Sequence, residues 1–219
     1  MGSLKLSNFL HDLTTATAIF DLDYNCFSKG QLQSKEWLIE VLDNVRRAKT
    51  IHLGIVYILC GWYGILASML FLKFEIIPSI RSFDIDKKCE KIADQMNKTY
   101  SSQDWRFKAI TEDIHDINFE KHSWQCWSNK NNRMSRPLTD IPTTIINTSC
   151  EHTGPEWFNN IPKGKLVILQ STDFLDGEGH VNCVTDLEGF REMYPLETVH
   201  YDGQMDLPEY KRFMLIGVK

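Results

Sequence analysis

The stretch Ile51–Ile77, IHLGIVYILCGWYGILASMLFLKFEII, decides the fold of this chain. Its part from Leu53 to Leu72 has no charged side chain, and a run of roughly 20 such residues is the usual signature of a membrane helix. Two glycines, Gly61 and Gly64, divide the run into halves of different composition. Two structures are therefore to be compared. One is a membrane-spanning helix, and the other is a strand followed by a buried helix.

The composition of the halves favours the strand and the helix. Residues 51–59 are rich in β-branched and aromatic side chains, which suit a strand buried on both faces. Residues 65–72 consist mainly of Ile, Leu, Ala and Met, which suit a helix. A strand, a glycine turn and a buried helix begin a nucleotide-binding βα unit. We therefore predict this unit and no membrane association.

A second strand with an acidic end follows at residues 80–86, IRSFDID. In a doubly wound sheet, a carboxylate at the end of the second strand accepts hydrogen bonds from ribose hydroxyls. Asp84 has the spacing from Gly64 that this role requires. Asp86 is the better N-cap for the amphipathic helix expected over residues 87–97. The pattern predicts a nucleoside site at Asp84.

The remaining apolar runs complete an α/β fold. We expect a doubly wound, mostly parallel seven-stranded sheet that ends in an antiparallel strand pair, with helices on both faces. Residues 1–48 are predicted to be an N-terminal helical segment and possible cap, with its clearest helix beginning at an N-cap Ser34. Residues 49–219 form the predicted Rossmann-like domain. The strands are expected at residues 51–59, 80–86, 105–111, 143–149, 165–171, 196–201 and 210–218.

Composition limits the class of protein. The 219 residues are 42% hydrophobic and 24% charged, which is typical of one globular domain. A net charge of −5 makes binding to bulk nucleic acid unexpected. The six cysteines are scattered and no apolar signal-peptide core precedes them, so we expect a cytoplasmic protein with reduced thiols. His122 and Cys126 lack a second ligand pair, and no metal site is predicted.

The order of these elements resembles that of the class I S-adenosylmethionine-dependent methyltransferases, over about Thr50 to Lys219. The antiparallel pair expected within Leu196–Val218 also resembles the end of that fold, and it favours a methyltransferase over a dehydrogenase. The resemblance implies S-adenosyl-L-methionine as cofactor and methyl transfer as the activity. It implies these cofactor-binding residues: Gly61, Trp62 and Gly64 in the first turn, Asp84 and Ile85 after the second strand, Asp113 and Ile114 after the third, and Asn147 after the fourth.

The first motif departs from that of the family. Tyr57 stands where the family has an acidic residue, and Leu59 or Cys60 stands at the first glycine. We expect polar residues of the N-terminal segment, Gln31, Ser34 or Lys35, to compensate by meeting the amino and carboxylate groups of the cofactor.

The acceptor side is expected at the carboxyl ends of the later strands. His152 is the first candidate for a base, since the unperturbed imidazole pKa lies near neutrality. Glu151, Asp173 and His180 are the other candidates. For each of them, an ordinary loop residue is the competing interpretation.

Three functions remain open from the sequence. The first is an enzyme that methylates a small molecule or a protein side chain. The second is a catalytically silent protein of the same fold that binds a nucleoside or a partner protein, and the third is another nucleotide-using enzyme, such as an NAD-dependent one. We further expect Cys26–Trp37 and Glu120–Asp140 to close over the carboxyl ends of the strands as lids, with Trp124 and Trp127 as lid residues or as packing anchors. The oligomeric state is open.

Overall fold

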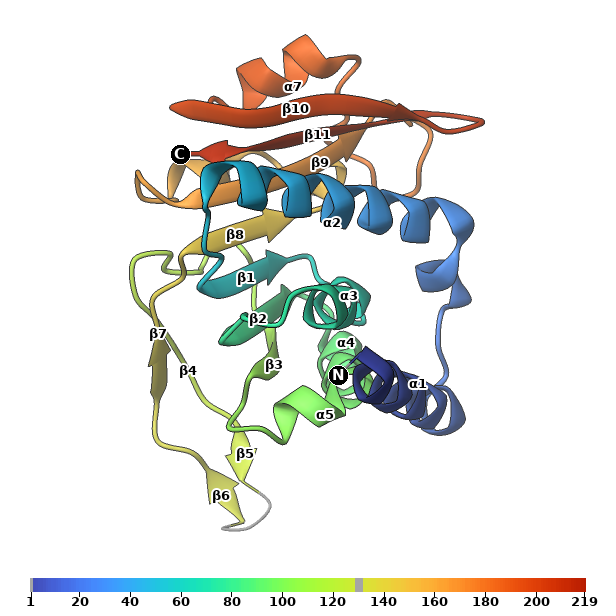
Figure 1. Cartoon of the computed structure of the whole chain (residues 1–219), viewed down its shortest axis with the longest axis vertical. Helices are drawn as coiled ribbons and strands as arrows, with labels where there is room; N and C mark the ends of the chain where they lie inside the picture. Colours follow the sequence, from blue (N-terminus) through green and yellow to red (C-terminus); the bar gives the residue numbers. More distant parts are fainter. Residues whose placement is uncertain (1, 129–131) are drawn as a thin grey trace.

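A mixed sheet of seven strands forms the centre of the protein, in the order β10-β11-β9-β8-β1-β2-β3 (Figure 1). The computed structural model describes residues 2–128 and 132–219. Strands β1, β2, β3, β8 and β9 are parallel to one another, and β11 runs antiparallel to β9 and β10. The predicted fold class is confirmed. The strands are β1 Ile55–Leu59, β2 Ser79–Asp84, β3 Phe107–Thr111, β8 Thr144–Asn147, β9 Leu166–Thr172, β10 Thr198–Asp206 and β11 Lys211–Val218.

The apolar stretch around the two glycines forms β1 and the helix α3, Ile65–Lys73. Val56 and Ile58 of β1 belong to the core on one face of the sheet, while Tyr57 and Leu59 belong to the core on the other. All four side chains are at most 1% exposed, as expected for a central strand. In the described residues, we find no helix with the length and apolarity to cross a bilayer.

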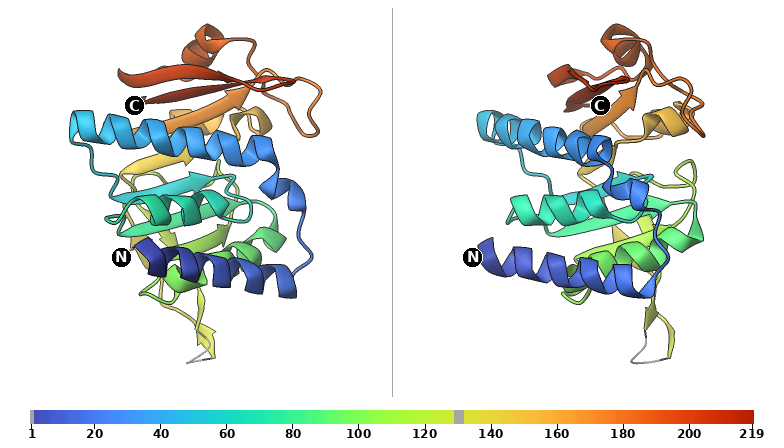
Figure 2. Two further views of the ribbon diagram at one scale, coloured as in Figure 1. Left: turned by 45° about the vertical axis from the view of Figure 1, so that its right-hand side comes forward. Right: turned by 90° about the vertical axis from the view of Figure 1, so that its right-hand side faces the viewer.

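One face of the sheet is covered by the helices of the first half of the chain (Figure 2). Helix α2 buries Leu38 and Leu42 in the same core as Val56 and Ile58. Helix α1 contributes Ala16 to a smaller cluster with Ile92 of α4. The helices are α1 Gly2–Ile19, α2 Lys29–Lys49, α3, α4 Lys87–Met96 and the short α5 Lys98–Ser101; a 3₁₀ turn, η1 Tyr24–Phe27, precedes α2.

The predicted start of α2 at Ser34 is wrong. The helix begins at Lys29, and the Oγ of Ser28 caps it by accepting from the N–H of Gln31. Ser34 is buried and donates to Oε1 of Gln170 at 2.8 Å. The first turns of α2 carry few apolar side chains because they border a cavity, so the apolar periodicity begins later than the helix.

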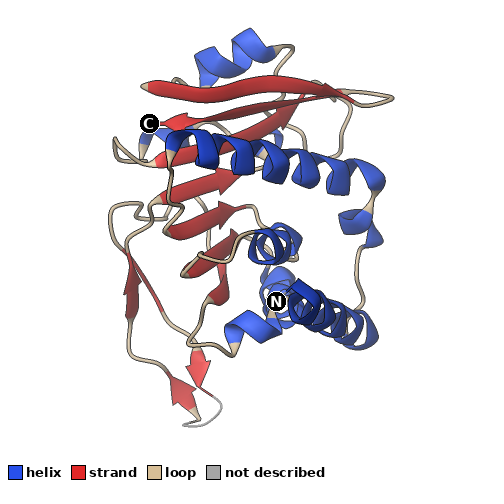
Figure 3. Cartoon of the chain, in the orientation of Figure 1, coloured by secondary structure: helices blue, strands red, loops and turns tan. Residues whose placement is uncertain are grey.

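The opposite face carries two short helices, α6 Glu156–Asn159 and α7 Leu187–Met193, together with the connection from β3 to β8. This connection contains no helix among its described residues, and short strands take the place of a helix (Figure 3). The His122 ring packs edge-on against Tyr57 and Phe83 of the sheet. The strands pair as β4 His122–Trp124 with β7 Leu138–Asp140, and β5 Trp127–Ser128 with β6 Arg133–Met134.

Candidate functional site

A cavity of about 760 Å³ lies at the carboxyl ends of the parallel strands. Its walls come from the turns after β1, β2, β3 and β8, and from the N-terminal segment around η1 and the start of α2. The carboxyl ends of strands in open α/β sheets are the usual place for a ligand. The lining residues are Asp23, Asn25, Cys26, Gln31, Lys35, Ile58, Cys60–Tyr63, Ile65, Leu66, Asp84–Asp86, Cys89, Glu112–His115, Thr148, Ser149, His152–Gly154 and Glu178.

The turn after β1 has an uncommon backbone. Cys60 and Trp62 have φ values of 51° and 47°, in the left-handed region that non-glycine residues rarely adopt. Gly61, between them, donates its N–H to the carbonyl of Phe83 in β2 at 2.9 Å. Such backbone conformations are concentrated at binding and catalytic sites. The turn therefore marks this end of β1 as a candidate ligand site.

Gly64 ends the turn after β1 and packs closely against α4. Gly64 is the N-cap residue of α3 and has a φ of 73°, in the left-handed region. A Cβ at this position would lie 2.8 Å from Nδ2 of Asn97 and 3.2 Å from Cβ of Ala93. Gly64 is therefore required by backbone conformation and by close packing on α4, and it does not line the cavity.

Asp84 is fixed at the end of β2 by two backbone groups. Its Oδ2 accepts from the N–H of Trp62 at 2.8 Å, and its Oδ1 accepts from the N–H of Asp86 at 3.0 Å. Each carboxylate oxygen has two lone pairs, so each can still accept from a ligand. Asp86 is the N-cap of α4 and accepts from the N–H of Lys88, as predicted.

The cavity walls after β2 and β3 combine acids with apolar side chains. Oδ1 of Asp113 accepts from the N–H and from Nδ1 of His115, and these hydrogen bonds lower the pKa of Asp113. Ile85 is 71% exposed beside the cavity, whereas Ile114 is buried below it. An exposed aliphatic side chain next to a carboxylate suits a flat, partly polar ring such as a nucleobase.

The N-terminal segment supplies a cation. Nζ of Lys35 donates to Oε1 of Gln31 at 2.5 Å. Burial, and next the positive charge of Arg212, lower the pKa of Lys35 to about 8. The backbone N–H of Asp23 donates to the Tyr63 hydroxyl at 3.4 Å, which ties this segment to the turn after β1. Gln31 and Lys35 thus reach the cavity as expected, whereas Ser34 does not.

The cysteine at the first-glycine position is unsuited to nucleophilic chemistry. Burial raises the pKa of Cys60 to about 12, and the negative charge of Asp84 adds to this effect. The thiol therefore stays protonated near neutral pH, and a thiolate is the form that reacts.

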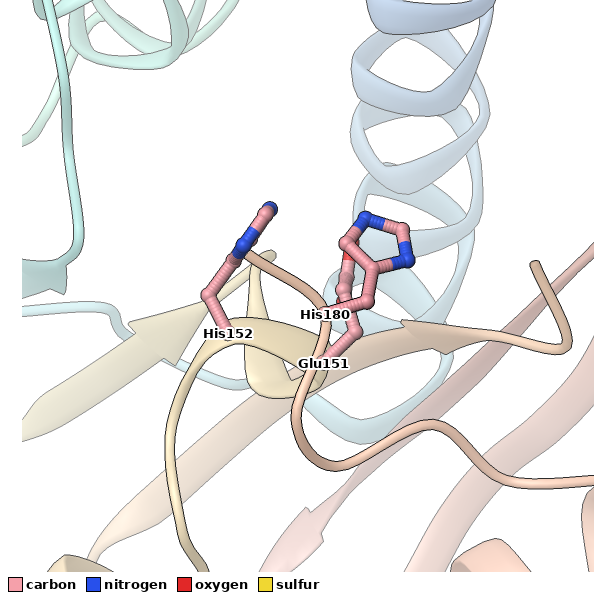
Figure 4. A group of neighbouring side chains, drawn as sticks. All are labelled: Glu151, His152 and His180. Carbon is pink, nitrogen blue, oxygen red and sulfur yellow. The ribbon is translucent and has the colours of Figure 1, made fainter. Parts of the chain in front are cut away.

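Two histidines and a glutamate lie together where β8 ends (Figure 4). Glu151 and His152 belong to the 3₁₀ turn η2, Cys150–His152, and His180 lies in the segment that follows β9. The imidazole rings of the two histidines are 4.7 Å apart between centroids and nearly perpendicular. Glu151 is buried, and its Oε1 accepts from Nη1 of Arg212 at 2.6 Å.

Several predicted site residues come together and others do not. The cavity is lined by Gly61, Trp62, Asp84, Ile85, Asp113, Ile114 and His152, but not by Gly64, Asn147, Glu151, Asp173 or His180. Asn147 is fully buried, with its Oδ1 on the N–H of Ser149. Oδ1 of Asp173 accepts from the N–H of Lys211 and fastens β9 to β11. Both side chains therefore form hydrogen bonds to backbone groups at the ends of strands and do not line the cavity.

The predicted lid at Glu120–Asp140 is wrong for the described residues of this segment, none of which lines the cavity. Trp124 is 5% exposed, and its Nε1 donates to Oδ2 of Asp140 at 2.6 Å. The segment replaces the crossover helix between β3 and β8, and the sheet face needs this cover. Residues 129–131 lie outside the described residues.

Sequence reasoning missed other lining residues. Glu112 precedes the predicted Asp113 directly, and Thr148 and Ser149 follow Asn147, so a wider window at each strand end would have included them. Glu178 carries no such signal, because a loop far along the chain brings it to the cavity. Among the described residues, His122 and Cys126 belong to no group of three metal-ligating side chains.

No protein-family model and no curated protein matches this sequence. Solved methyltransferase structures do match its fold. Magnesium protoporphyrin IX methyltransferase from Synechocystis PCC 6803, with bound S-adenosylmethionine, matches over 96% of this chain and 90% of that one, with TM-score 0.57 and 11% identity. A putative sarcosine dimethylglycine methyltransferase from Galdieria sulphuraria matches over 86% of each chain, with TM-score 0.59 and 13% identity.

A third solved methyltransferase also matches the fold. The N-methyltransferase NodS from Bradyrhizobium japonicum WM9 matches over 85% of this chain and 97% of that one, with TM-score 0.58 and 10% identity. At such identities the likeness establishes the fold alone. The chain has the fold of the class I S-adenosylmethionine-dependent methyltransferases.

Proposed function

We propose that this protein is an S-adenosylmethionine-dependent methyltransferase that acts on a small molecule or a protein side chain. The observation that carries the proposal is the position of Asp84. Its carboxylate is fixed at the end of β2, on the wall of a cavity of about 760 Å³, in a chain with a methyltransferase fold. When bound, the cofactor supplies a methyl group activated by attachment to a positively charged sulfur.

The residues of the cavity suit the nucleoside part of this cofactor. Asp84 keeps free lone pairs for ribose hydroxyls. Ile85 offers an exposed aliphatic surface for the adenine ring, and Asp113 a carboxylate for its amino group. Asn147 is left out of the proposed binding set because it is fully buried.

The methionine part needs partners for an amino group and a carboxylate. Lys35 is the cation of the N-terminal segment that lines the cavity, and Asp23 and Gln31 line it as well. We assign the carboxylate of the cofactor to Lys35, which carries its charge below a pKa of about 8. The N-terminal segment then acts as a cap and compensates for Tyr57 and Cys60 in the first motif.

The acceptor end is assigned to His152. Its Nδ1 lies 3.0 Å from the carbonyl oxygen of Gly179. A carbonyl can only accept, so Nδ1 carries the proton of the neutral ring and Nε2 keeps its lone pair. In a site without a metal, Nε2 is the group that takes the proton of the acceptor. The net charge of −5 favours acceptors other than bulk nucleic acid. We also assign the protein to the cytoplasm, because its six cysteines are scattered along the chain.

A catalytically silent protein is the second candidate. The departure of the first motif favours it, because Tyr57 is buried on the far face of the sheet and cannot meet a ligand. Such a protein would keep the fold and lose cofactor affinity.

Titration calorimetry with S-adenosylmethionine and S-adenosylhomocysteine decides between the two candidates. The enzyme should bind both ligands at one site per chain, and NAD should not displace either of them. Absence of binding to either ligand by a folded sample would reject the methyltransferase and favour the silent protein. A positive result should be followed by a screen of acceptors that detects S-adenosylhomocysteine release.

A further inference from the structure

We propose that Glu151, His152 and His180 form a binding site for one divalent transition-metal ion at the acceptor end of the cavity. Each side chain offers one ligand atom, and these atoms all lie within 4.8 Å of one another. Figure 4 shows the three side chains side by side, from η2 and from the segment after β9. Among the described residues, these three side chains make up the one group of three or more possible metal ligands.

The two imidazoles are prepared for metal binding by their outer hydrogen bonds. Nδ1 of His152 lies 3.0 Å from the carbonyl oxygen of Gly179, and Nδ1 of His180 lies 2.5 Å from that of Phe174. Both Nδ1 atoms are therefore donors, and both Nε2 atoms are left with a lone pair. Histidine ligands of metals commonly donate their other N–H to a backbone carbonyl in this way.

The carboxylate provides an independent indication. Glu151 is 3% exposed, and its Oε2 is buried without a hydrogen-bond partner, while Oε1 is held by Arg212. An unpartnered buried carboxylate oxygen is costly, and a bound ion is one of the few groups that would satisfy it. The competing explanation is a purely structural ion pair with Arg212, whose Nε is also unpaired.

The local backbone holds the third ligand in place. The carbonyl of Glu151 accepts from the N–H groups of Val181 and Asn182 at 2.8 and 3.0 Å. These bonds fasten the His180 segment to η2. A Cβ at Gly177 would lie 2.4 Å from the His180 ring, so the loop can bring this ring close only because residue 177 is glycine.

The ligand set indicates the kind of ion and its use. Two imidazoles and one carboxylate suit Mn²⁺, Fe²⁺, Co²⁺ or Zn²⁺ better than Mg²⁺ or Ca²⁺, which prefer oxygen ligands. Arg212 offsets the charge of Glu151, so we expect weaker metal binding than an unpaired carboxylate would give. Three protein ligands leave open positions, and His152 borders the cavity, so these positions are available to an oxygen of the acceptor.

This use of the site rests on the proposed function. With the ion bound, His152 is a ligand and no longer a base. The ion lowers the pKa of a coordinated acceptor hydroxyl, whose proton passes to water. The acceptor oxygen then forms a bond to the methyl carbon as the bond from that carbon to sulfur breaks. The electron pair of the broken bond remains on sulfur. The acceptor class is therefore one that presents a hydroxyl, or two adjacent oxygens that chelate the ion.

The test is a Co²⁺ titration of the tag-free chain after treatment with EDTA, followed by visible absorption and by metal analysis. One Co²⁺ per chain with a ligand-field band is expected. His180→Ala and His152→Ala should each weaken binding at least tenfold, whereas His52→Ala, at an exposed position before β1, should not. Circular dichroism must show that the variants are folded. Acetohydroxamate, a chelating oxygen ligand, should shift the band.

The outcomes separate this proposal from the proposed function. Absence of stoichiometric Co²⁺ uptake, or equal affinity in His180→Ala and His52→Ala, would overturn the metal site. An unchanged band with acetohydroxamate would overturn the role in acceptor binding. Calorimetry with S-adenosylmethionine is run on the same sample: binding of the cofactor without Co²⁺ uptake rejects the metal site alone, and Co²⁺ uptake without cofactor binding supports the site and rejects the methyltransferase.

Discussion

Oδ2 of Asp84 accepts a hydrogen bond from the backbone N–H of Trp62 at 2.8 Å, and this bond joins the end of β2 to the turn after β1. Trp62 has φ 47°, so the carboxylate stabilises a left-handed turn residue that would otherwise be unfavourable. One side chain thus fixes the shape of the turn and presents its remaining lone pairs to the cavity.

Asp84→Asn should weaken binding of S-adenosylmethionine by tens of times. The substitution keeps a carbonyl oxygen for Trp62 but removes the charge, and a hydrogen bond to a charged group contributes about 1.5–3 kcal/mol. Titration calorimetry measures the difference. Asp116→Asn is the matched control, because Asp116 is exposed and lies outside the cavity. Equal affinities of the Asp84 variant and the parent would remove this carboxylate from the binding site.

Gly64→Ala should destabilise the protein by about 1–3 kcal/mol, the range for a strained left-handed residue. Two effects combine at this position: φ is 73°, and a Cβ would lie 2.8 Å from Nδ2 of Asn97. Gly164→Ala separates them, because Gly164 has φ 83° but no atom within 4 Å of its Cβ position. Urea unfolding should show the larger loss for Gly64→Ala. The same loss in both variants would mean that packing on α4 contributes nothing.

Much of the fold could be predicted because its signals are local. The β-branched half of the apolar run forms β1, and Asp86 caps α4. The position of Asp84 at the end of β2 follows from the acidic end of the second apolar run and from its spacing from Gly64. These features depend on residues close to one another in the chain, and a single sequence carries that information.

The features that were not predicted depend on distant residues. The position of Ser34 is decided by Gln170, and the crossover after β3 is decided by the sheet face that it covers. The neighbourhood of Glu151 and His180 depends on two backbone hydrogen bonds across a loop. Neither periodicity nor turn chemistry reports contacts of this kind, so the two histidines appeared in the sequence only as separate candidates.

Trp124→Ala should cost about 3–5 kcal/mol of unfolding free energy, as is typical when a large aromatic core residue is truncated. Trp124 is 5% exposed, donates to Asp140 and lies under the guanidinium of Arg81. Trp127→Ala is the comparison, since Trp127 is 52% exposed and its loss should change stability by about 0.5 kcal/mol or less. Denaturant unfolding of both variants gives the values. Cofactor affinity should be unchanged in each. Loss of activity in Trp124→Ala with an unchanged unfolding midpoint would restore the lid interpretation.

The stability of the ligand-free protein should depend on the titration of Lys35. Its pKa in the folded protein, about 8, lies below the value of about 10.4 for an unfolded lysine, so the unfolded chain holds this proton more firmly. The charged lysine therefore lowers stability below about pH 8, and this cost disappears as the pH rises from about 8 towards 10. Lys35→Met should accordingly have a higher Tm than the parent at neutral pH, with a difference that shrinks in that window. Lys29→Met, at an exposed position on the same helix, should show no such trend.

The same titration should control cofactor affinity if Lys35 meets the carboxylate of the cofactor. Only the charged lysine attracts a carboxylate, so affinity should fall as the pH rises through about 8. The amino group of the ligand also titrates near this pH, but it does so equally for both proteins, and the ratio of parent to Lys35→Met affinity removes its effect. Calorimetry at several pH values should give a ratio well above one at neutral pH that approaches one in alkaline solution. A ratio that does not change with pH would place the carboxylate of the cofactor elsewhere in the cavity.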